Sequence, residues 1–149
     1  AVGRRGGKSR IAALVAVYLA CFKDYRNILA PGERGTLPVI AADRRQARTV
    51  MRYIVALLDG CPMLARMVIN RTAEAVELTN GVVIEVHTAS FRAVRGYTVV
   101  AAVLDEIAFW RSEDSANPDR EIVNAIRPAM ATVPDALLLA ISCKTHDLI

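Results

Sequence analysis

Short apolar runs alternate with longer amphipathic stretches along this chain. Three runs are continuous and apolar, as expected for strands buried on both faces of a parallel sheet: residues 37–42, 98–104 and 136–141. Between them, apolar residues recur every three to four positions, which is the period of one helix face. Strands that alternate with helices in this way predict an α/β fold of three layers with a mostly parallel sheet.

Helices are expected over residues 9–22, 44–59 and 118–130. The inward face of the first is predicted to hold Ile11, Leu14, Val15, Tyr18, Leu19 and Phe22. The second starts after Asp43, an N-cap residue with Gln46 as its capping-box partner, and stops at Gly60. Its inward face is predicted to hold Ala47, Val50, Met51, Ile54, Leu57 and Leu58. The third turns Ile122, Ile126, Ala129 and Met130 inward, with a kink expected at Pro128.

An antiparallel hairpin is expected as an addition to the sheet. Residues 73–79 and 82–88 alternate between apolar and polar positions around Asn80-Gly81, the dipeptide most typical of a two-residue hairpin turn. A short helical turn is expected over 62–68, and loops over 23–36 and 90–96.

The composition fits one globular domain. The chain has 149 residues, of which 54% are hydrophobic and 23% charged, enough to bury a single core. The net charge of +4 comes mainly from arginine, which suits a phosphate-rich partner but also an ordinary basic surface. No apolar run has membrane-spanning length, so no membrane partner is expected. Cys21, Cys61 and Cys143 lack metal-ligand spacing and are predicted to be buried free thiols of a reducing cytosol.

A glycine-rich turn, Gly3-Arg4-Arg5-Gly6-Gly7-Lys8-Ser9, leads directly into the first predicted helix. Such a turn directs backbone N–H groups toward a phosphate, and the helix N-terminus adds its partial positive charge. In this pattern Lys8 reaches the β- and γ-phosphates of a nucleotide and the Ser9 hydroxyl coordinates Mg²⁺. The usual pattern has its first glycine where Val2 stands, so a turn without a nucleotide is the alternative.

Acidic residues follow one of the predicted strands. Ligands of open α/β sheets bind beyond the carboxyl ends of the strands, and both Asp105-Glu106 and Ser142 are expected at such ends. Asp105 is placed to hold the Mg²⁺ that Ser9 also contacts, directly or through a water. Glu106 can take a proton from a water aimed at the γ-phosphate. A solvated turn or helix cap is the alternative for this pair, and the upstream glycine-rich turn favours the metal site.

The adjacent glutamate also bears on the type of reaction. A nucleotide kinase brings its own acceptor, whereas ATP hydrolysis needs a group that activates water, so Glu106 favours hydrolysis. Helicases with a D-E-x-H or D-E-x-D box carry His or Asp where this chain has Ala108.

Arg4 or Arg5 could neutralise charge that develops at the β–γ bridge. Arg95 could do so for a neighbouring subunit, or could be a solvated or DNA-facing cation.

Six segments form an ordered series along the chain. They are the turn from Gly3 to Ser9, Val39-Ile40-Ala41-Ala42-Asp43-Arg44-Arg45-Gln46-Ala47, Arg95-Gly96, Val103-Leu104-Asp105-Glu106, Ile126-Arg127-Pro128-Ala129-Met130-Ala131-Thr132 and Leu139-Ala140-Ile141-Ser142. The series resembles the ATPase domain of the large subunit of tailed-phage terminases, the motor that packages DNA into procapsids. The resemblance spans nearly the whole chain, and in that family the shifted glycine and the loop arginine are normal.

The resemblance implies an additional-strand, RecA-like P-loop NTPase fold that binds ATP and Mg²⁺. Its implied nucleotide-binding residues are Gly3, Arg5, Gly6, Gly7, Lys8 and Ser9. Its implied reactive residues are Asp105 as a metal ligand, Glu106 as the catalytic carboxylate, Arg4 as the loop arginine, Arg95 as an arginine acting in trans, and Ser142 as the residue that couples hydrolysis to movement. The implied partners are double-stranded DNA, the portal of the procapsid, the small terminase subunit and identical subunits in a ring. The implied location is the host bacterial cytoplasm.

The chain departs from the family pattern after Ser142. Cys143 and Lys144 follow it where the family more often has Ser or Thr and then Pro, which weakens the coupling assignment. We expect residues 1–149 to form a single ATPase domain of a longer protein, with a strand before the glycine-rich turn and a nuclease domain after the chain. A helicase or recombination ATPase, or an inactive prophage remnant that keeps the fold without turnover, is the alternative.

Overall fold

A computed structural model of the chain describes residues 7–89, 96–107, 110 and 118–142. The elements in these ranges are α1 (Lys8–Phe22), β1 (Gly35–Ala41), α2 (Arg44–Asp59), α3 (Pro62–Ala65), β2 (Val68–Arg71), β3 (Ala75–Leu78), β4 (Val82–Thr88), β5 (Thr98–Val99), β6 (Ala101–Asp105), α4 (Pro118–Met130) and β7 (Leu137–Ile141). Strands alternate with helices, which confirms the α/β class predicted from the sequence.

The strands form one mostly parallel sheet. Their order is β2-β3-β4-β1-β6-β7, and β5 pairs with β1. β1 runs parallel to β4 and β6, and β6 runs parallel to β7. β3 pairs antiparallel with β4 around the predicted Asn80-Gly81 turn, and β2 pairs antiparallel with β3. The hairpin is therefore present, but β4 itself belongs to the parallel part of the sheet. The carboxyl ends of β4, β1, β6 and β7 all lie at one edge.

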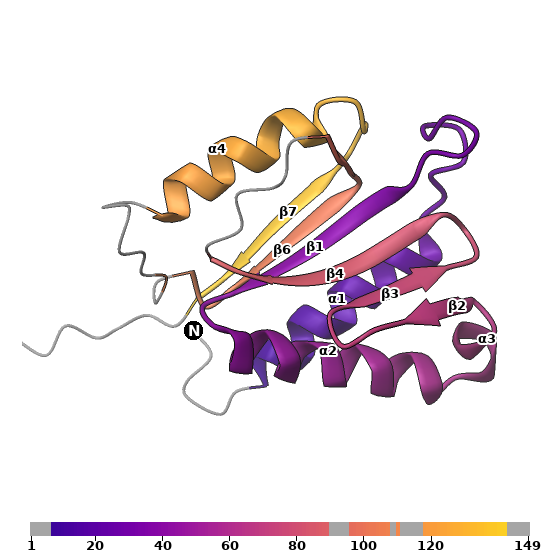
Figure 1. The fold of residues 1–149 in the computed structure, drawn as a ribbon, viewed down its shortest axis with the longest axis horizontal. Coiled ribbons are helices and arrows are strands. Elements are labelled where there is room, and N and C mark those ends of the chain that lie inside the picture. The colour runs from indigo at the N-terminus through magenta and orange to yellow at the C-terminus, as the bar shows by residue number, and fades with distance from the viewer. Residues whose placement is uncertain (1–6, 90–95, 108–109, 111–117, 143–149) are drawn as a thin grey trace, which may run out of the picture.

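Helices cover both faces of the sheet, with α1 and α2 on one side and α4 on the other (Figure 1). Successive residues of the central strands alternate between two cores. Val39 and Val103 pack on the side of α1 and α2, whereas Ile40 and Leu104 pack with Ile126 of α4. β1 and β6 are buried throughout, and burial on both faces explains their continuous apolar sequence. The inward residues predicted for α4 are buried or, for Ala129, partly buried.

The inward face predicted for α1 is largely wrong. Ile11, Leu14, Tyr18 and Phe22 are 46–57% exposed. The residues that face the core are mostly small, namely Ala12, Ala13, Ala16, Val17, Leu19 and Ala20. α1 packs against α2 and against β6 and β4, and small side chains let the helix backbone lie close to these elements. Both sides of α1 are apolar, so a prediction of the buried side from periodicity alone chooses the side with the larger residues.

Two strand predictions also need correction, and one strand was not predicted. The strand expected over 136–141 was predicted to be buried, but β7 ends the strand order and is only partly buried, with Leu137 41% exposed. The strand expected over 98–104 is interrupted at Val100, between β5 and β6. β2 was not predicted, because its residues show no alternation and are mostly exposed.

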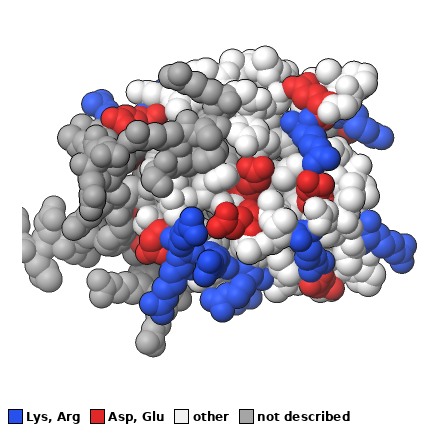
Figure 2. Space-filling view, in the orientation of Figure 1, with Lys and Arg blue, Asp and Glu red and all other residues white. Residues whose placement is uncertain are grey.

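The cysteines Cys21 and Cys61 are free, as predicted, but they are partly exposed rather than buried. Cys143 lies outside the described residues. No helix in the part of the chain that the structure describes is long and apolar enough to cross a membrane. On the face shown in Figure 2, basic side chains gather over the start of α2, beside a group of acidic ones.

The environment of Cys21 gives a testable pH dependence. Partial burial raises the pKa of its thiol to about 11, so only about one thiol in a thousand is ionised at pH 8. The thiolate is the nucleophile, so the rate of alkylation by iodoacetamide follows the ionised fraction. At that pH we expect the Cys21 thiol to be alkylated roughly a hundredfold more slowly than the thiol of glutathione. The rate should rise about tenfold for each pH unit up to pH 10. Peptide mass spectrometry measures it, and a plateau near pH 9 would contradict the shift.

Candidate functional site

The site begins at the N-terminus of α1. Gly7, its N-cap residue, has φ of 71°, in the left-handed region that glycine adopts without strain. A Cβ at this position would meet nothing within 4 Å, so the backbone conformation alone requires glycine. The first turn of α1 carries no acidic residue and no side-chain cap. The first turn of α1 therefore has no carboxylate of its own to offset the positive end of the helix dipole, which favours anions.

Lys8 is the first residue of α1 and forms an ion pair with Glu106, the residue that follows β6. The Lys8 Nζ and Glu106 Oε1 atoms are 3.2 Å apart, and the two side chains are 9% and 26% exposed. Glu106 has φ of 57°, which is uncommon for a residue with a side chain. Such strain tends to occur where surrounding structure holds a functional group in place. Here it accompanies a carboxylate held against the ammonium group of Lys8.

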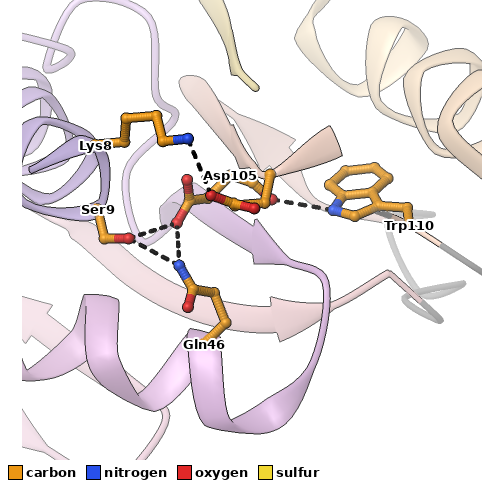
Figure 3. Close-up of polar contacts among 6 residues, drawn as sticks. Lys8, Ser9, Gln46, Asp105 and Trp110 are labelled. Atoms are coloured by element: carbon orange, nitrogen blue, oxygen red, sulfur yellow. Dashed lines mark hydrogen bonds and ion pairs between the residues drawn. The ribbon is translucent and has the colours of Figure 1, made fainter. Parts of the chain in front are cut away.

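Asp105 is the last residue of β6, and its side chain is fully buried. Its Oδ2 atom accepts hydrogen bonds from Ser9 Oγ at 3.1 Å and from Gln46 Nε2 at 2.9 Å (Figure 3). Its Oδ1 atom has no hydrogen-bond partner among the described residues. Trp110 Nε1 donates to the backbone oxygen of Asp105 at 3.1 Å. A buried carboxylate oxygen without a partner is costly, which points to a ligand or ion at this position.

Gln46 is a site residue that the sequence analysis missed. Asp43 caps α2 as predicted, accepting from Gln46 N at 2.8 Å. The Gln46 side chain does not complete the predicted capping box. Its Nε2 atom donates instead to Ser9 Oγ at 2.8 Å and to Asp105 Oδ2. Gln46 lies just beyond the carboxyl end of β1, and the rule that ligands bind at such ends could have identified it.

The oxygen atoms at this site suit Mg²⁺. Among the residues with a described structure, no group of three or more His, Cys, Asp and Glu side chains could hold a metal. Mg²⁺ does not need such a cage, since it is usually bound by one or two carboxylates, waters and substrate phosphates. The free Oδ1 atom of Asp105 and the neighbouring Ser9 hydroxyl fit that mode of binding.

The other predicted site residues fall into two groups. Gly3, Arg4, Arg5, Gly6 and Arg95 lie outside the described residues. Ser142 directly follows β7, whose last residue, Ile141, is in register with Asp105. Ser142 is therefore at the same edge of the sheet as the acidic pair. The structure brings Lys8, Ser9, Asp105 and Glu106 together, as the sequence predicted.

Comparison with known proteins identifies solved structures with a similar fold. No protein-family model matches the sequence, and no curated protein matches it. The crystal structure of the HK97 bacteriophage large terminase does match, with a TM-score of 0.65 and 22% identity, over 95% of this chain and 28% of that chain. The large terminase ATPase domain of Thermus phage P74-26 matches with a TM-score of 0.61 and 20% identity, over 94% and 56% of the two chains.

The chain has the fold of a phage large-terminase ATPase domain. An arginine-to-alanine mutant of the P74-26 domain agrees, with a TM-score of 0.56 and 18% identity over 98% of this chain and 59% of that one. The likeness at this level of identity establishes the fold. The chain spans little more than a quarter of the HK97 protein and just over half of the P74-26 domain. The terminase resemblance drawn from the sequence motifs agrees with this fold.

Proposed function

We propose that this chain is the ATP-hydrolysing part of a terminase-type DNA-packaging motor, a P-loop NTPase of the additional-strand, RecA-like kind. The observation that carries the proposal is the convergence of Lys8, Ser9, Asp105 and Glu106 at one edge of the sheet. These residues supply a cation for phosphates, a hydroxyl and a carboxylate for Mg²⁺, and a second carboxylate for proton transfer. The terminase-like fold supports the same function.

Lys8 and Glu106 have separate tasks in this proposal. Their side chains form an ion pair in the structure. When ATP binds, the Lys8 ammonium moves its contacts to the β- and γ-phosphate oxygens, which frees the Glu106 carboxylate. A water oxygen then forms a bond to the γ-phosphorus while the bond to the β–γ bridging oxygen breaks. Glu106 accepts the proton that the water loses, and ADP leaves with the electron pair of the broken bond.

Ser9 and Asp105 would hold the Mg²⁺ ion. When bound, the ion would neutralise charge on the β- and γ-phosphates. Gly7 would bring backbone N–H groups to the phosphates, together with Gly3, Arg5 and Gly6. Arg4 and Arg95 are proposed to stabilise the charge that develops during hydrolysis, and Ser142 to couple hydrolysis to movement.

Four exposed arginines on α2 support a nucleic-acid partner. None of Arg44, Arg45, Arg48 and Arg52 forms an ion pair within the described residues. Two of them lie in the first turn, which has no acidic residue, although the helix dipole disfavours cations there. Arginines that lie where the helix dipole disfavours them, and that have no acidic partner among the described residues, are suited to contact phosphates. Figure 2 shows basic side chains gathered over the start of α2.

The arginine face of α2 leads to a prediction about DNA affinity. Arg48→Ala combined with Arg52→Ala should weaken binding to double-stranded DNA regardless of its sequence, because backbone contacts carry no sequence information. The slope of log affinity against log salt should become shallower by about 2, roughly one for each lost phosphate contact. Fluorescence anisotropy over a salt series measures both. Arg71→Ala is the control, because Arg71 pairs with Asp59; an equal effect of that change would contradict the assignment.

Two assays of the full-length protein test the function as a whole. Mg²⁺-dependent ATP hydrolysis distinguishes an active motor from an inactive remnant that keeps only the fold. ATP-driven packaging of double-stranded DNA into procapsids, with portal and small terminase subunit present, distinguishes a terminase from a helicase, which would unwind free duplex. We place this activity in the host bacterial cytoplasm, in a ring of identical subunits.

A further inference from the structure

We propose that Gln46 is a positioning residue for the metal half of this site. Its amide group holds the Ser9 hydroxyl and the Asp105 carboxylate in the arrangement that receives Mg²⁺. The inference rests on the proposed function, because it assigns to those two residues the Mg²⁺ that accompanies ATP. It adds a third residue, from a different element, on which the metal site depends.

The three side chains form a closed triangle of hydrogen bonds. Gln46 Nε2 donates to Ser9 Oγ at 2.8 Å and to Asp105 Oδ2 at 2.9 Å. Ser9 Oγ in turn donates to Asp105 Oδ2 at 3.1 Å. Ser9 is in the first turn of α1, Gln46 is in the first turn of α2, and Asp105 ends β6. Figure 3 shows all three side chains directed to the same point. The triangle thus ties three elements together at the carboxyl edge of the sheet.

The hydrogen-bonding capacity of each group shows what Gln46 contributes. A serine hydroxyl has one hydrogen and two lone pairs. In the triangle, the Ser9 hydrogen is donated to Asp105 and one lone pair accepts from Gln46. The second lone pair is then left for a metal. Without the Gln46 amide, the hydroxyl would have one fixed bond instead of two and could rotate about its C–O bond.

Gln46 has a matching effect on Asp105. The amide and the Ser9 hydroxyl both donate to Oδ2, and Oδ1 accepts no hydrogen bond in the described part of the chain. The carboxylate is therefore held so that one oxygen is fully engaged and the other is available to Mg²⁺ or to one of its waters. Only the NH₂ side of an amide can do this, because its carbonyl oxygen would repel the carboxylate.

The backbone of Gln46 is itself held in place. Its N–H donates to the Asp43 side chain that caps α2. α2 packs against α1, β1 and β4, and the next residue, Ala47, is buried. Gln46 could have used its side chain to complete the capping box with Asp43. It bonds instead to residues 37 and 59 positions away in the sequence. A local bond has thus been replaced by bonds to the two groups proposed as metal ligands.

The test is Gln46→Met, which keeps the length of the side chain and removes the donors. Calorimetry on the full-length protein would measure binding of a non-hydrolysable ATP analogue, once over a Mg²⁺ series and once in EDTA. We expect the Mg²⁺ concentration at half-maximal binding to rise by about 10–100-fold, the usual effect of removing a group that orients metal ligands. Affinity for the metal-free nucleotide should change by less than about twofold. Gln46→Ala, which adds no bulk, should show the same split if the methionine variant is unstable.

Controls separate a metal effect from a packing effect. Thr49→Ala changes a residue one turn further along α2. Among the described residues its hydroxyl bonds only to Arg45 and Arg52 of the same helix, so the substitution should leave the Mg²⁺ requirement unchanged. Thermal unfolding in EDTA reports the stability of each variant. The inference would be overturned by an unchanged Mg²⁺ requirement in both Gln46 variants, or by a loss of metal-free nucleotide binding as large as the loss of binding with Mg²⁺. In either case nucleotide binding by the wild-type protein would still uphold the proposed function. Absence of nucleotide binding by the wild-type protein would overturn both.

Discussion

Replacing Lys8 by alanine is expected to abolish detectable ATP binding. Lys8 is nearly buried at the positive end of α1, and in the proposed complex its ammonium group bonds to two phosphate groups. Hydrogen bonds to charged groups contribute about 1.5–3 kcal/mol each, so the loss of two corresponds to roughly a hundredfold or more in affinity. The substitution also leaves the Glu106 carboxylate without its partner beside the triphosphate, which adds repulsion. Calorimetry with ATP and Mg²⁺ measures the change.

A second lysine provides the control for this prediction. Lys23 follows the last residue of α1 and donates to the backbone oxygen of Asp135, far along the helix from Gly7. Lys23→Ala removes the same charge and should leave ATP affinity within about twofold of wild type, because exposed charges beyond a Debye length are largely screened. ATP affinity that is unchanged by Lys8→Ala would remove the phosphate-binding role of the glycine-rich turn.

Replacing Glu106 by glutamine should separate binding from turnover. The amide has the same shape as the carboxylate but cannot accept a proton from water, so we expect hydrolysis to fall by about 10²–10⁴-fold. ATP binding should be retained or slightly stronger, because the ion pair between Lys8 and Glu106 no longer competes with the phosphates for the Lys8 ammonium. Single-turnover hydrolysis measures the chemical step, and equilibrium binding of ATP measures affinity.

Glu77→Gln is a matched control for that substitution. Glu77 is also partly buried, with 31% of its side chain exposed, and is also ion-paired, with Arg34 at 2.7 Å. It lies on β3, in the antiparallel part of the sheet. Its substitution should leave turnover unchanged, so a loss confined to Glu106→Gln cannot come from removal of a surface ion pair. Near-normal turnover in Glu106→Gln would show that another group activates the water.

Much of the candidate site could be predicted because its residues follow from local sequence. Gly7 and Lys8 belong to a recognisable turn, and Asp105 and Glu106 directly follow a buried strand. Parallel strands bring their carboxyl ends to one edge, so the order of elements was enough to predict that these residues meet. The Asp43 cap and the Asn80-Gly81 turn likewise depend only on residues a few positions apart.

The sequence by itself determined the alternation of strands and helices, the positions where strands end and the charged groups at those ends, because these depend on neighbouring residues. The tertiary structure alone decided which apolar side of α1 is buried, that β7 lies at the end of the strand order, and that Gln46 bonds to Ser9 and Asp105. Each of these depends on how closely two distant segments approach. Periodicity records where apolar residues recur, but it does not record which element packs against them.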